Sequence, residues 1–472
     1  MRTRVQEKCG IFGVYGKDFE AARLVHPGLW ALQHRGQESS GIASSDGKRI
    51  YLHKGMGLVA HVFGEEDLIK LKGYIAIGHN RYSTSGDSIV SHAQPILEKV
   101  PGGKSIAVVH NGNLPTLKKL EQFLQKQKIS TEGLNDSEMI AKAIAFFVKM
   151  GKSLENAITK AYPLFTGVFC LLVIDEKKMI AVRDSFGIRP LSLGKLNGGF
   201  IFASETCALD IIGAKFVREV RPGEMIVIDK QGLKSIQIEK GTQKLDVFEF
   251  IYFARPDSTL LGKSVDAVRQ NLGKELAREN TIRADVVIPV PDSAISAAIG
   301  FSKQSGIPFE MGLIKNRYIH RTFISPAEHS RQKIVQLKLN PMKHVLFGKK
   351  VVVIDDSIVR GTTSKQIIKM IRDAGAKEVH LLVSCPPYRF PDFYGIDTPR
   401  QKELIANNKN IVQITKELGV DSLHYLSYKG LIKATELSED LFCTSCFTGN
   451  YPVDIGERIK EVTYEKNSSI NF

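Results

Sequence analysis

The run at residues 351–364 combines carboxylates, hydroxyls and glycine in an order that suits a sugar phosphate. Its sequence is VVVIDDSIVRGTTS, an apolar strand followed by Asp355 and Asp356 and then by a turn rich in Gly and Thr. Backbone N–H groups, hydroxyls and the N-terminus of a following helix can together hold a phosphate monoester, and the residues available are Arg360, Gly361, Thr362, Thr363 and Ser364. Two carboxylates so close would repel a phosphate unless they face vicinal sugar hydroxyls or a divalent cation. The run therefore favours a ribose phosphate, although Asp-Asp-Ser alone is more typical of a helix N-cap.

A second set of residues could cleave an amide. Cys9 stands at the head of an apolar strand, where a lone Cys is usually an inert core residue. Asn111 and Gly112 can donate hydrogen bonds to an oxyanion. Arg81 can pair with an α-carboxylate, and Asp136 can pair with an α-ammonium group. Together with a thiol nucleophile, these residues predict free glutamine as the substrate.

The nucleophile also needs a base that takes the thiol proton. No His lies near Cys9 in the sequence. If residues 1–8 are removed, however, the new α-amino group has an ordinary pKa of about 7.7 to 8.0 and can take the thiol proton. We therefore expect the chain start itself to become catalytic.

Two kinds of element must position these residues. Upstream, short β-rich runs at 106–110, 168–174 and 199–203 surround an apolar-periodic stretch at 137–150, which predicts an α+β sandwich. Downstream, strands that are apolar throughout, at 285–290, 351–354 and 379–384, alternate with helix-like stretches at 294–303 and 364–374. Such strands are buried on both faces, which predicts a parallel sheet with ligands at its carboxyl ends. The character changes near residues 230–250, where we expect a domain boundary.

The downstream motif resembles the signature of type I phosphoribosyltransferases. The resemblance implies that Asp355 and Asp356 contact the ribose and that Gly361 to Ser364 hold its 5-phosphate, with Arg360 beside them. It also implies that Pro291-Asp292-Ser293 forms the pyrophosphate loop. Ser293, Asp355 and Asp356 then become candidate ligands of Mg²⁺. Residues 316–324 and the polar stretch up to 341 are expected to form a mobile lid, although an ordinary exposed basic loop is the alternative.

The upstream segments resemble the glutaminase domain of class II amidotransferases, which use an N-terminal nucleophile. The motifs that carry this resemblance are residues 9–16, 32–41, 78–84, 110–113 and 135–138. It implies a four-layer sandwich, a propeptide at 1–8 and Cys9 as the nucleophile. His34, His79 and His110 are then expected to be structural.

The whole chain resembles the amidophosphoribosyltransferase family, and Glu249-Phe250-Ile251-Tyr252-Phe253-Ala254-Arg255-Pro256-Asp257-Ser258 at the junction strengthens the match. The resemblance implies a glutaminase domain at 9–235 and a phosphoribosyltransferase domain at 250–472. Nitrogen would pass as ammonia, through a channel formed on lid closure, to C1 of phosphoribosyl pyrophosphate. Inhibition by purine nucleotides and a homotetramer or homodimer are also implied. His320 departs from the family, which usually has Gly in this part of the lid.

Three cysteines in the second half raise the question of a metal. One branch of the family holds a 4Fe-4S cluster with three Cys placed like Cys385, Cys443 and Cys446 and with a fourth three residues before Glu249. The fourth position is Asp246 in this chain, a harder ligand than thiolate. We expect a cluster held by these four residues; zinc at the same residues, or no metal, are the alternatives.

Composition limits the other readings of the chain. It has 472 residues, and 65 Lys and Arg against 50 Asp and Glu give a net charge of +15, which suits nucleic acid, an acidic membrane or polyanionic small substrates. No apolar run reaches the roughly 20 residues that cross a bilayer, and no apolar region follows the charged first eight residues, so we expect neither a membrane span nor export. Six cysteines are too few for a disulfide framework, which fits a reducing cytoplasm.

One alternative function is a regulator that senses phosphoribosyl ligands and binds nucleic acid. Another is a class II amidotransferase with a different acceptor, such as a hexosamine-phosphate or asparagine synthase. Nothing in the sequence resembles a helix-turn-helix or an aromatic RNA-binding signature, so we expect no nucleic-acid partner. The motif from Asp355 to Ser364 is not expected in a class II enzyme with another acceptor.

Overall fold

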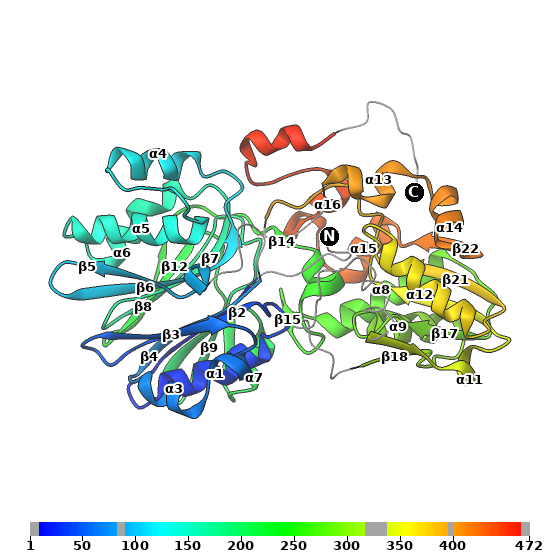
Figure 1. Ribbon diagram of the computed structural model, residues 1–472, viewed down its shortest axis with the longest axis horizontal. Helices are drawn as coiled ribbons and strands as arrows, with labels where there is room; N and C mark the ends of the chain where they lie inside the picture. Colours follow the sequence, from blue (N-terminus) through cyan, green and yellow to red (C-terminus); the bar gives the residue numbers. More distant parts are fainter. Residues whose placement is uncertain (1–8, 83–89, 317–337, 395–399, 464–472) are drawn as a thin grey trace.

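The computed structural model describes residues 9–82, 90–316, 338–394 and 400–463, which form two halves joined side by side (Figure 1). The expected propeptide at 1–8 lies outside the described residues, and so does the expected lid from residue 317 to 337, which includes His320. Both therefore stay predictions.

Two antiparallel sheets form the centre of the N-terminal half, and helices cover the outer face of each (Figure 1). The seven-stranded sheet has the order β11-β9-β10-β1-β4-β2-β3, and the six-stranded sheet has the order β13-β12-β8-β7-β6-β5. Their facing sides share an apolar core that includes Ile11, Ile77, Val109 and Leu172. Separate cores join α1 to the first sheet and α5 to the second. The predicted four-layer sandwich is confirmed.

The elements of this half have the following bounds. The strands of the seven-stranded sheet are β1 (Gly10–Tyr15), β2 (Ser39–Ser45), β3 (Ile50–Met56), β4 (Ile75–Arg81), β9 (Ser192–Leu196), β10 (Gly199–Ala203) and β11 (Lys215–Glu219). Those of the six-stranded sheet are β5 (Ile96–Val100), β6 (Lys104–Asn113), β7 (Val168–Ile174), β8 (Met179–Arg183), β12 (Glu224–Asp229) and β13 (Gly232–Gln237). The helices are α1 (Ala21–Ala31), α2 (Val59–Val62), α3 (Glu65–Lys70), α4 (Lys118–Lys126), α5 (Asp136–Lys149), α6 (Leu154–Ala161) and α7 (Thr206–Asp210), with short turns η1 (Val90–His92) and η2 (Tyr162–Leu164).

A parallel sheet of four strands, in the order β17-β20-β21-β22, forms the centre of the C-terminal half. The central strand β20 is apolar from Val351 to Ile354 and fully buried there, because neighbouring strands and packed helices surround it. Its carboxyl end leads to Asp355 and then to the turn before α12. The predicted parallel sheet is confirmed, and the predicted strands match β17, β20 and β21 to within one residue at each end.

The main elements of this half are as follows. The sheet consists of β17 (Val286–Pro289), β20 (Lys350–Asp355), β21 (Glu378–Val383) and β22 (Ser422–Tyr425). The helices are α8 (Val265–Glu279), α9 (Ile295–Ser305), α11 (Lys343–Leu346), α12 (Thr362–Asp373), α13 (Ile405–Asn408), α14 (Ile411–Leu418), α15 (Tyr428–Thr435) and α16 (Ser445–Thr448). Two-strand pairs are formed by β14 (Leu245–Asp246) with β23 (Phe442–Cys443), β15 (Thr259–Leu260) with β16 (Lys263–Ser264), and β18 (Leu313–Lys315) with β19 (Leu339–Pro341). A short π-helix, η3, spans Glu249–Phe253, and short 3-10 helices are η4 (Gln401–Glu403), η5 (Glu439–Leu441) and η6 (Gly456–Glu461).

The junction between the halves is structured. Strand β13 ends at Gln237, slightly beyond the predicted limit at residue 235. Asp246 then pairs in parallel with Cys443, which ties the linker to the C-terminal segment. The domain limits 9–235 and 250–472 stay a prediction. Among the described residues no helix is long and apolar enough to cross a membrane.

Candidate active sites

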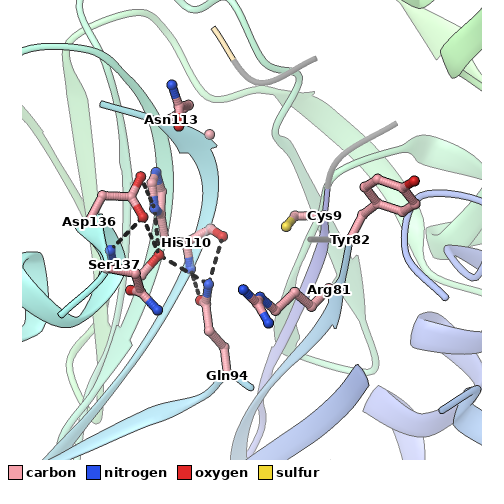
Figure 2. Close-up of a pocket in the computed structure, with 10 residues that line it drawn as sticks. Cys9, Arg81, Tyr82, Gln94, His110, Asn113, Asp136 and Ser137 are labelled. Atoms are coloured by element: carbon pink, nitrogen blue, oxygen red, sulfur yellow. Dashed lines mark hydrogen bonds and ion pairs between the residues drawn. The ribbon is translucent and has the colours of Figure 1, made fainter. Parts of the chain in front are cut away.

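The residues predicted to handle glutamine line one cavity in the N-terminal half. Figure 2 shows the thiol of Cys9 and the guanidinium of Arg81 on one side and Asp136 on the other. Gly112 also lines the cavity, whereas Asn111 is fully buried beside it. The cavity therefore holds a nucleophile, a cation and an anion, which is the set that an amino acid with a side-chain amide requires.

Strand pairing brings Arg81 to Cys9. Cys9 directly precedes β1, and the first residue of that strand, Gly10, is paired with Asn80 of β4. The next residue of β4 is Arg81, so the guanidinium and the thiol emerge at the same sheet end. Arg81 is almost fully buried, and its Nη1 lies 3.5 Å from Oε1 of Glu38. A buried guanidinium of this kind is suited to a carboxylate ligand.

The helix α5 places Asp136 at its first turn. The Asn135 side chain accepts a hydrogen bond from the Glu138 backbone N–H at 2.9 Å, and the Glu138 carboxylate accepts one from the Asn135 N–H at 2.8 Å. This reciprocal capping box determines where the helix begins. Asp136 itself accepts a hydrogen bond from the backbone N–H of Leu114 at 3.3 Å. The carboxylate is thereby held at the cavity wall.

A polar network lies behind Asp136 (Figure 2). The Oγ of Ser137 lies 2.9 Å from Nδ1 of His110 and accepts a hydrogen bond from the Gln94 amide at 3.1 Å. The Gln94 Oε1 accepts the backbone N–H of His110 at 2.6 Å. Burial lowers the pKa of His110 and lowers that of His79 to about 3, so both rings are neutral at pH 7. Neutral buried rings suit the structural role expected for them.

The predicted oxyanion donors lie on β6, opposite β7. Gly112 approaches β7 so closely that a Cβ there would lie 2.0 Å from the carbonyl oxygen of Val168. Only glycine fits at this distance. The side-chain amide of Asn111 donates to Ser204 Oγ at 3.3 Å, and the same Oγ accepts the backbone N–H of Ile11 at 3.0 Å. Ser204 thus links the Asn111 amide to the strand that carries Cys9.

The C-terminal half brings its predicted residues together at the ends of two neighbouring strands. Because β17 and β20 are parallel, their carboxyl ends meet, and Ser293 Oγ donates a hydrogen bond to the Asp356 carboxylate. Asp355 and Asp356 are both buried. Lys315 Nζ donates to Asp292 at 2.6 Å. Two carboxylates and a hydroxyl so placed are oxygen ligands of the kind that Mg²⁺ prefers.

The expected phosphate turn leads into α12. Gly361 has φ +78°, a left-handed conformation that favours glycine, and a Cβ there would lie 2.7 Å from Cδ1 of Ile405. Thr362 is the first residue of the helix, two residues earlier than predicted, so the backbone N–H groups of its first turn point toward the strand ends. Arg360 forms an ion pair with Glu403 at 2.8 Å, a partner that the sequence did not indicate.

Cys385, Cys443, Cys446 and Asp246 are all buried, and Asp246 of the junction is paired with Cys443. Burial raises the pKa of Cys443 to about 12 and raises the pKa values of Cys385 and Cys446 well above the ordinary value. Burial also raises the pKa of Asp246 to about 8, with Arg189 3.5 Å from its Oδ2. Among the described residues, neither this Oδ2 nor the buried hydroxyl of Tyr388 has a hydrogen-bond partner.

These donors fit a thiolate cluster in kind, because soft buried sulfurs and an unsatisfied carboxylate oxygen face the same region. Within the described ranges, however, no three His, Cys, Asp or Glu side chains are arranged to hold a metal ion. This finding applies equally to a cluster and to zinc at these four residues, so the described geometry favours neither of them.

Several residues of the sites carry no local signal in the sequence. Gln94 and Ser204 contact predicted residues only through strand and helix packing, and Ser137 lies in the 135–138 motif without a predicted role of its own. Arg35 and Glu249 lie in segments that the sequence singles out, yet no role was predicted for either. Arg35 Nε donates to the carbonyl oxygen of Cys9 at 3.3 Å, and its two Nη atoms bond to Glu249.

Comparison with known proteins covers both halves. The family model of a glutamine amidotransferase domain matches residues 79–210, and that of a phosphoribosyl transferase domain matches residues 261–417. An amidophosphoribosyltransferase of Synechococcus elongatus is 48% identical over 462 residues, 97% of this chain and 94% of its own length. The Bacillus subtilis amidophosphoribosyltransferase is 44% identical over 457 residues, 96% of this chain and 95% of its own.

Solved structures agree with these relatives. The B. subtilis glutamine phosphoribosylpyrophosphate amidotransferase complexed with ADP and GMP superposes with a TM-score of 0.89 at 44% identity, covering 95% of this chain and 98% of that one. A structure described as the allosteric regulatory enzyme of purine biosynthesis gives a TM-score of 0.90 at 44% identity, with 95% and 97% covered.

Proposed function

Because this chain belongs to the amidophosphoribosyltransferase family, we propose that the two sites described above carry its two half-reactions. The enzyme transfers the amide nitrogen of glutamine to C1 of 5-phosphoribosyl 1-pyrophosphate. The products are 5-phosphoribosylamine, glutamate and pyrophosphate, and the reaction is the first step of purine biosynthesis. The matches to both halves favour this activity over that of a class II amidotransferase with another acceptor.

In the glutaminase half, we propose that Arg81 binds the α-carboxylate of glutamine and Asp136 binds its α-ammonium group. The Cys9 thiol then attacks the side-chain amide carbon, and the α-amino group exposed by loss of residues 1–8 takes the thiol proton. The Asn111 side-chain amide and the Gly112 N–H donate to the oxyanion. The same amino group returns the proton to the leaving ammonia, and water hydrolyses the γ-glutamyl thioester to glutamate.

In the phosphoribosyltransferase half, Asp355 and Asp356 accept hydrogen bonds from the ribose hydroxyls, and the turn at 360–364 holds the 5-phosphate. Asp292 and Ser293 belong to the loop that we propose binds the pyrophosphate. Mg²⁺ held by Ser293, Asp355 and Asp356 would supply charge for the leaving pyrophosphate. Ammonia from the first site attacks C1 as the C1–O bond to pyrophosphate breaks. The buried carboxylates orient the ribose for that attack.

We also propose that Cys385, Cys443, Cys446 and Asp246 hold a 4Fe-4S cluster. The support is that the three thiols are buried and that a carboxylate oxygen of Asp246 has no hydrogen-bond partner among the described residues. A bound cluster would cross-link the junction to the C-terminal segment. Anaerobic purification followed by iron analysis and a visible spectrum tests this; a preparation without iron and without a broad visible band would end the proposal.

A relative suggests how this enzyme is regulated. Since the B. subtilis structure is a complex with ADP and GMP, we propose that purine nucleotides inhibit this enzyme too. A homotetramer or homodimer and a cytoplasmic location remain predictions from the sequence.

The observation that supports the proposed glutaminase roles is that Cys9, Arg81 and Asp136 line the same cavity. We expect Cys9→Ala to lose glutamine-dependent turnover and to keep turnover with added ammonia. Asp355→Asn combined with Asp356→Asn should lose both, because both nitrogen sources require the phosphoribosyl site. If Cys9→Ala used glutamine normally, the assignment of Cys9 would be wrong.

A further inference from the structure

The junction segment 249–258 has no role in the reaction proposed above, yet its first residue is among the most buried charges of the chain. Glu249 is the first residue of the short π-helix η3, and its side chain is 0% exposed. Its Oε1 accepts from Nη2 of Arg35 at 2.6 Å and from Nη1 of Arg189 at 3.1 Å, and its Oε2 accepts from Nη1 of Arg35 at 3.0 Å. A carboxylate from the junction is therefore surrounded by guanidinium groups of the N-terminal half.

Arg35 connects this carboxylate to the nucleophile. Its Nε donates to the Cys9 carbonyl oxygen at 3.3 Å, while both of its Nη atoms bond to Glu249. Because a guanidinium is planar and rigid, the two bonds to Glu249 determine the direction in which Nε points. Cys9 precedes the first paired residue of β1, so this contact supports a peptide group outside the strand ladder.

A second carboxylate completes the arrangement. Glu205 accepts a hydrogen bond from Arg35 and others from Ser258 Oγ at 2.7 Å and the Arg255 backbone N–H at 2.8 Å. Both ends of the junction segment thus reach Arg35, one directly and one through Glu205. Desolvated charges in such a network resist separation, because any unpaired member would be a buried, uncompensated charge.

The C-terminal half holds the same segment from the other side. Arg269 of α8 donates from Nε to the carbonyl oxygen of Phe250 at 2.7 Å and from Nη2 to that of Ala254 at 2.8 Å. These bonds attach η3 to the first helix of the phosphoribosyltransferase half. Glu249 therefore connects the guanidinium that supports Cys9 to a junction segment that the C-terminal half holds in place.

We propose that Glu249 is a positioning residue for the glutaminase nucleophile, acting through Arg35. This inference rests on the proposed role of Cys9. Glu249 contacts neither glutamine nor the cavity that would bind it, so its contribution is to keep the Cys9 thiol in attacking position. A displacement of about 1 Å at a reacting group can cost about 10²-fold in rate.

The test is Glu249→Gln in the full-length enzyme, with Glu224→Gln as the matched control. The control removes an equally buried carboxylate that pairs with both Nη atoms of Arg218 at 2.7 Å, in the N-terminal half but outside the cavity that Cys9 lines. For Glu249→Gln we expect glutamine-dependent kcat to fall about 10²-fold. Its glutamine KM and its ammonia-dependent kcat should stay at wild-type values, and inactivation of Cys9 by 6-diazo-5-oxo-L-norleucine should slow in parallel. Glu224→Gln should keep the wild-type glutamine kcat.

The proposal is overturned if Glu249→Gln keeps wild-type glutamine kcat, or if glutamine- and ammonia-dependent rates fall together as a merely structural loss would produce. Should Glu249→Gln fail to fold, the same kinetics would be measured on Glu249→Asp, which keeps the negative charge on a side chain one methylene shorter. A wild-type kcat in that variant would equally refute the proposal. Cys9→Ala measured alongside separates the two hypotheses: if it retained glutamine turnover, the proposed nucleophile itself would be wrong.

Discussion

Replacing Gly112 by Ala tests the oxyanion site through a clash that can be worked out from the structure. The added Cβ would lie 2.0 Å from the carbonyl oxygen of Val168 and 2.7 Å from its carbonyl carbon. Both are backbone atoms of β7, which is paired on both sides within the six-stranded sheet. They cannot rotate away, so the backbone of β6 must move by about 1 Å to restore a normal contact.

That movement displaces the N–H group proposed to donate to the oxyanion. Loss of one such donor costs about 10²- to 10³-fold in kcat. We therefore expect glutamine-dependent kcat to fall by this factor. Ammonia-dependent turnover should be unchanged, because the phosphoribosyl site lies in the other half of the chain.

Steady-state kinetics with glutamine and with ammonium salt would measure both rates on the same preparation. Gly64→Ala is the control, since a Cβ at Gly64 meets only the Asp67 carboxylate at 3.6 Å, an ordinary contact. A folded Gly112→Ala enzyme with the glutamine-dependent kcat of Gly64→Ala would refute the assignment of Gly112.

Three further predictions concern binding, acid stability and the metal. Arg81→Lys should raise the glutamine KM about 10- to 100-fold in steady-state assays, since an ammonium group cannot make the forked contact, while ammonia-dependent kcat stays unchanged. Although burial alone would raise it, His34 and Arg35 hold the pKa of Glu205 well below its ordinary value of 4.5. This stabilisation is present above pH 4.5 and is lost as the pH falls, so thermal midpoints between pH 7 and pH 3 should drop more steeply for the wild type than for Glu205→Gln. Asp246→Cys should retain more iron per chain than the wild type after anaerobic dialysis against a chelator; equal retention would argue against Asp246 as a ligand.

Local patterns in the sequence predicted three of the four strands of the parallel sheet in the C-terminal half and missed β22. Strands such as 351–354 are apolar at every position, and only a strand covered on both faces tolerates that pattern, so burial and parallel pairing follow directly. The candidate ribose and phosphate residues could be predicted for the same reason, because the strand end, the acids and the turn are contiguous in the chain.

The N-terminal site depends on contacts between distant segments, which local patterns do not report. Arg81 reaches Cys9 because β4 pairs with β1, and the register of that pairing is set by the cores on both faces of the sheet. The motifs indicated which residue types belong to the site, but not the hydrogen bonds of Gln94, Ser137 and Ser204 that hold them.

What the sequence by itself determined is the family and the candidate chemistry of each half, since the proposed nucleophile, clamp residues and phosphate turn all appear in short motifs. Only the tertiary structure decided how the halves are connected. Glu249 and Arg35 are 214 positions apart, and their ion pair exists because folding buries both charges, and a buried charge is stable only beside its partner.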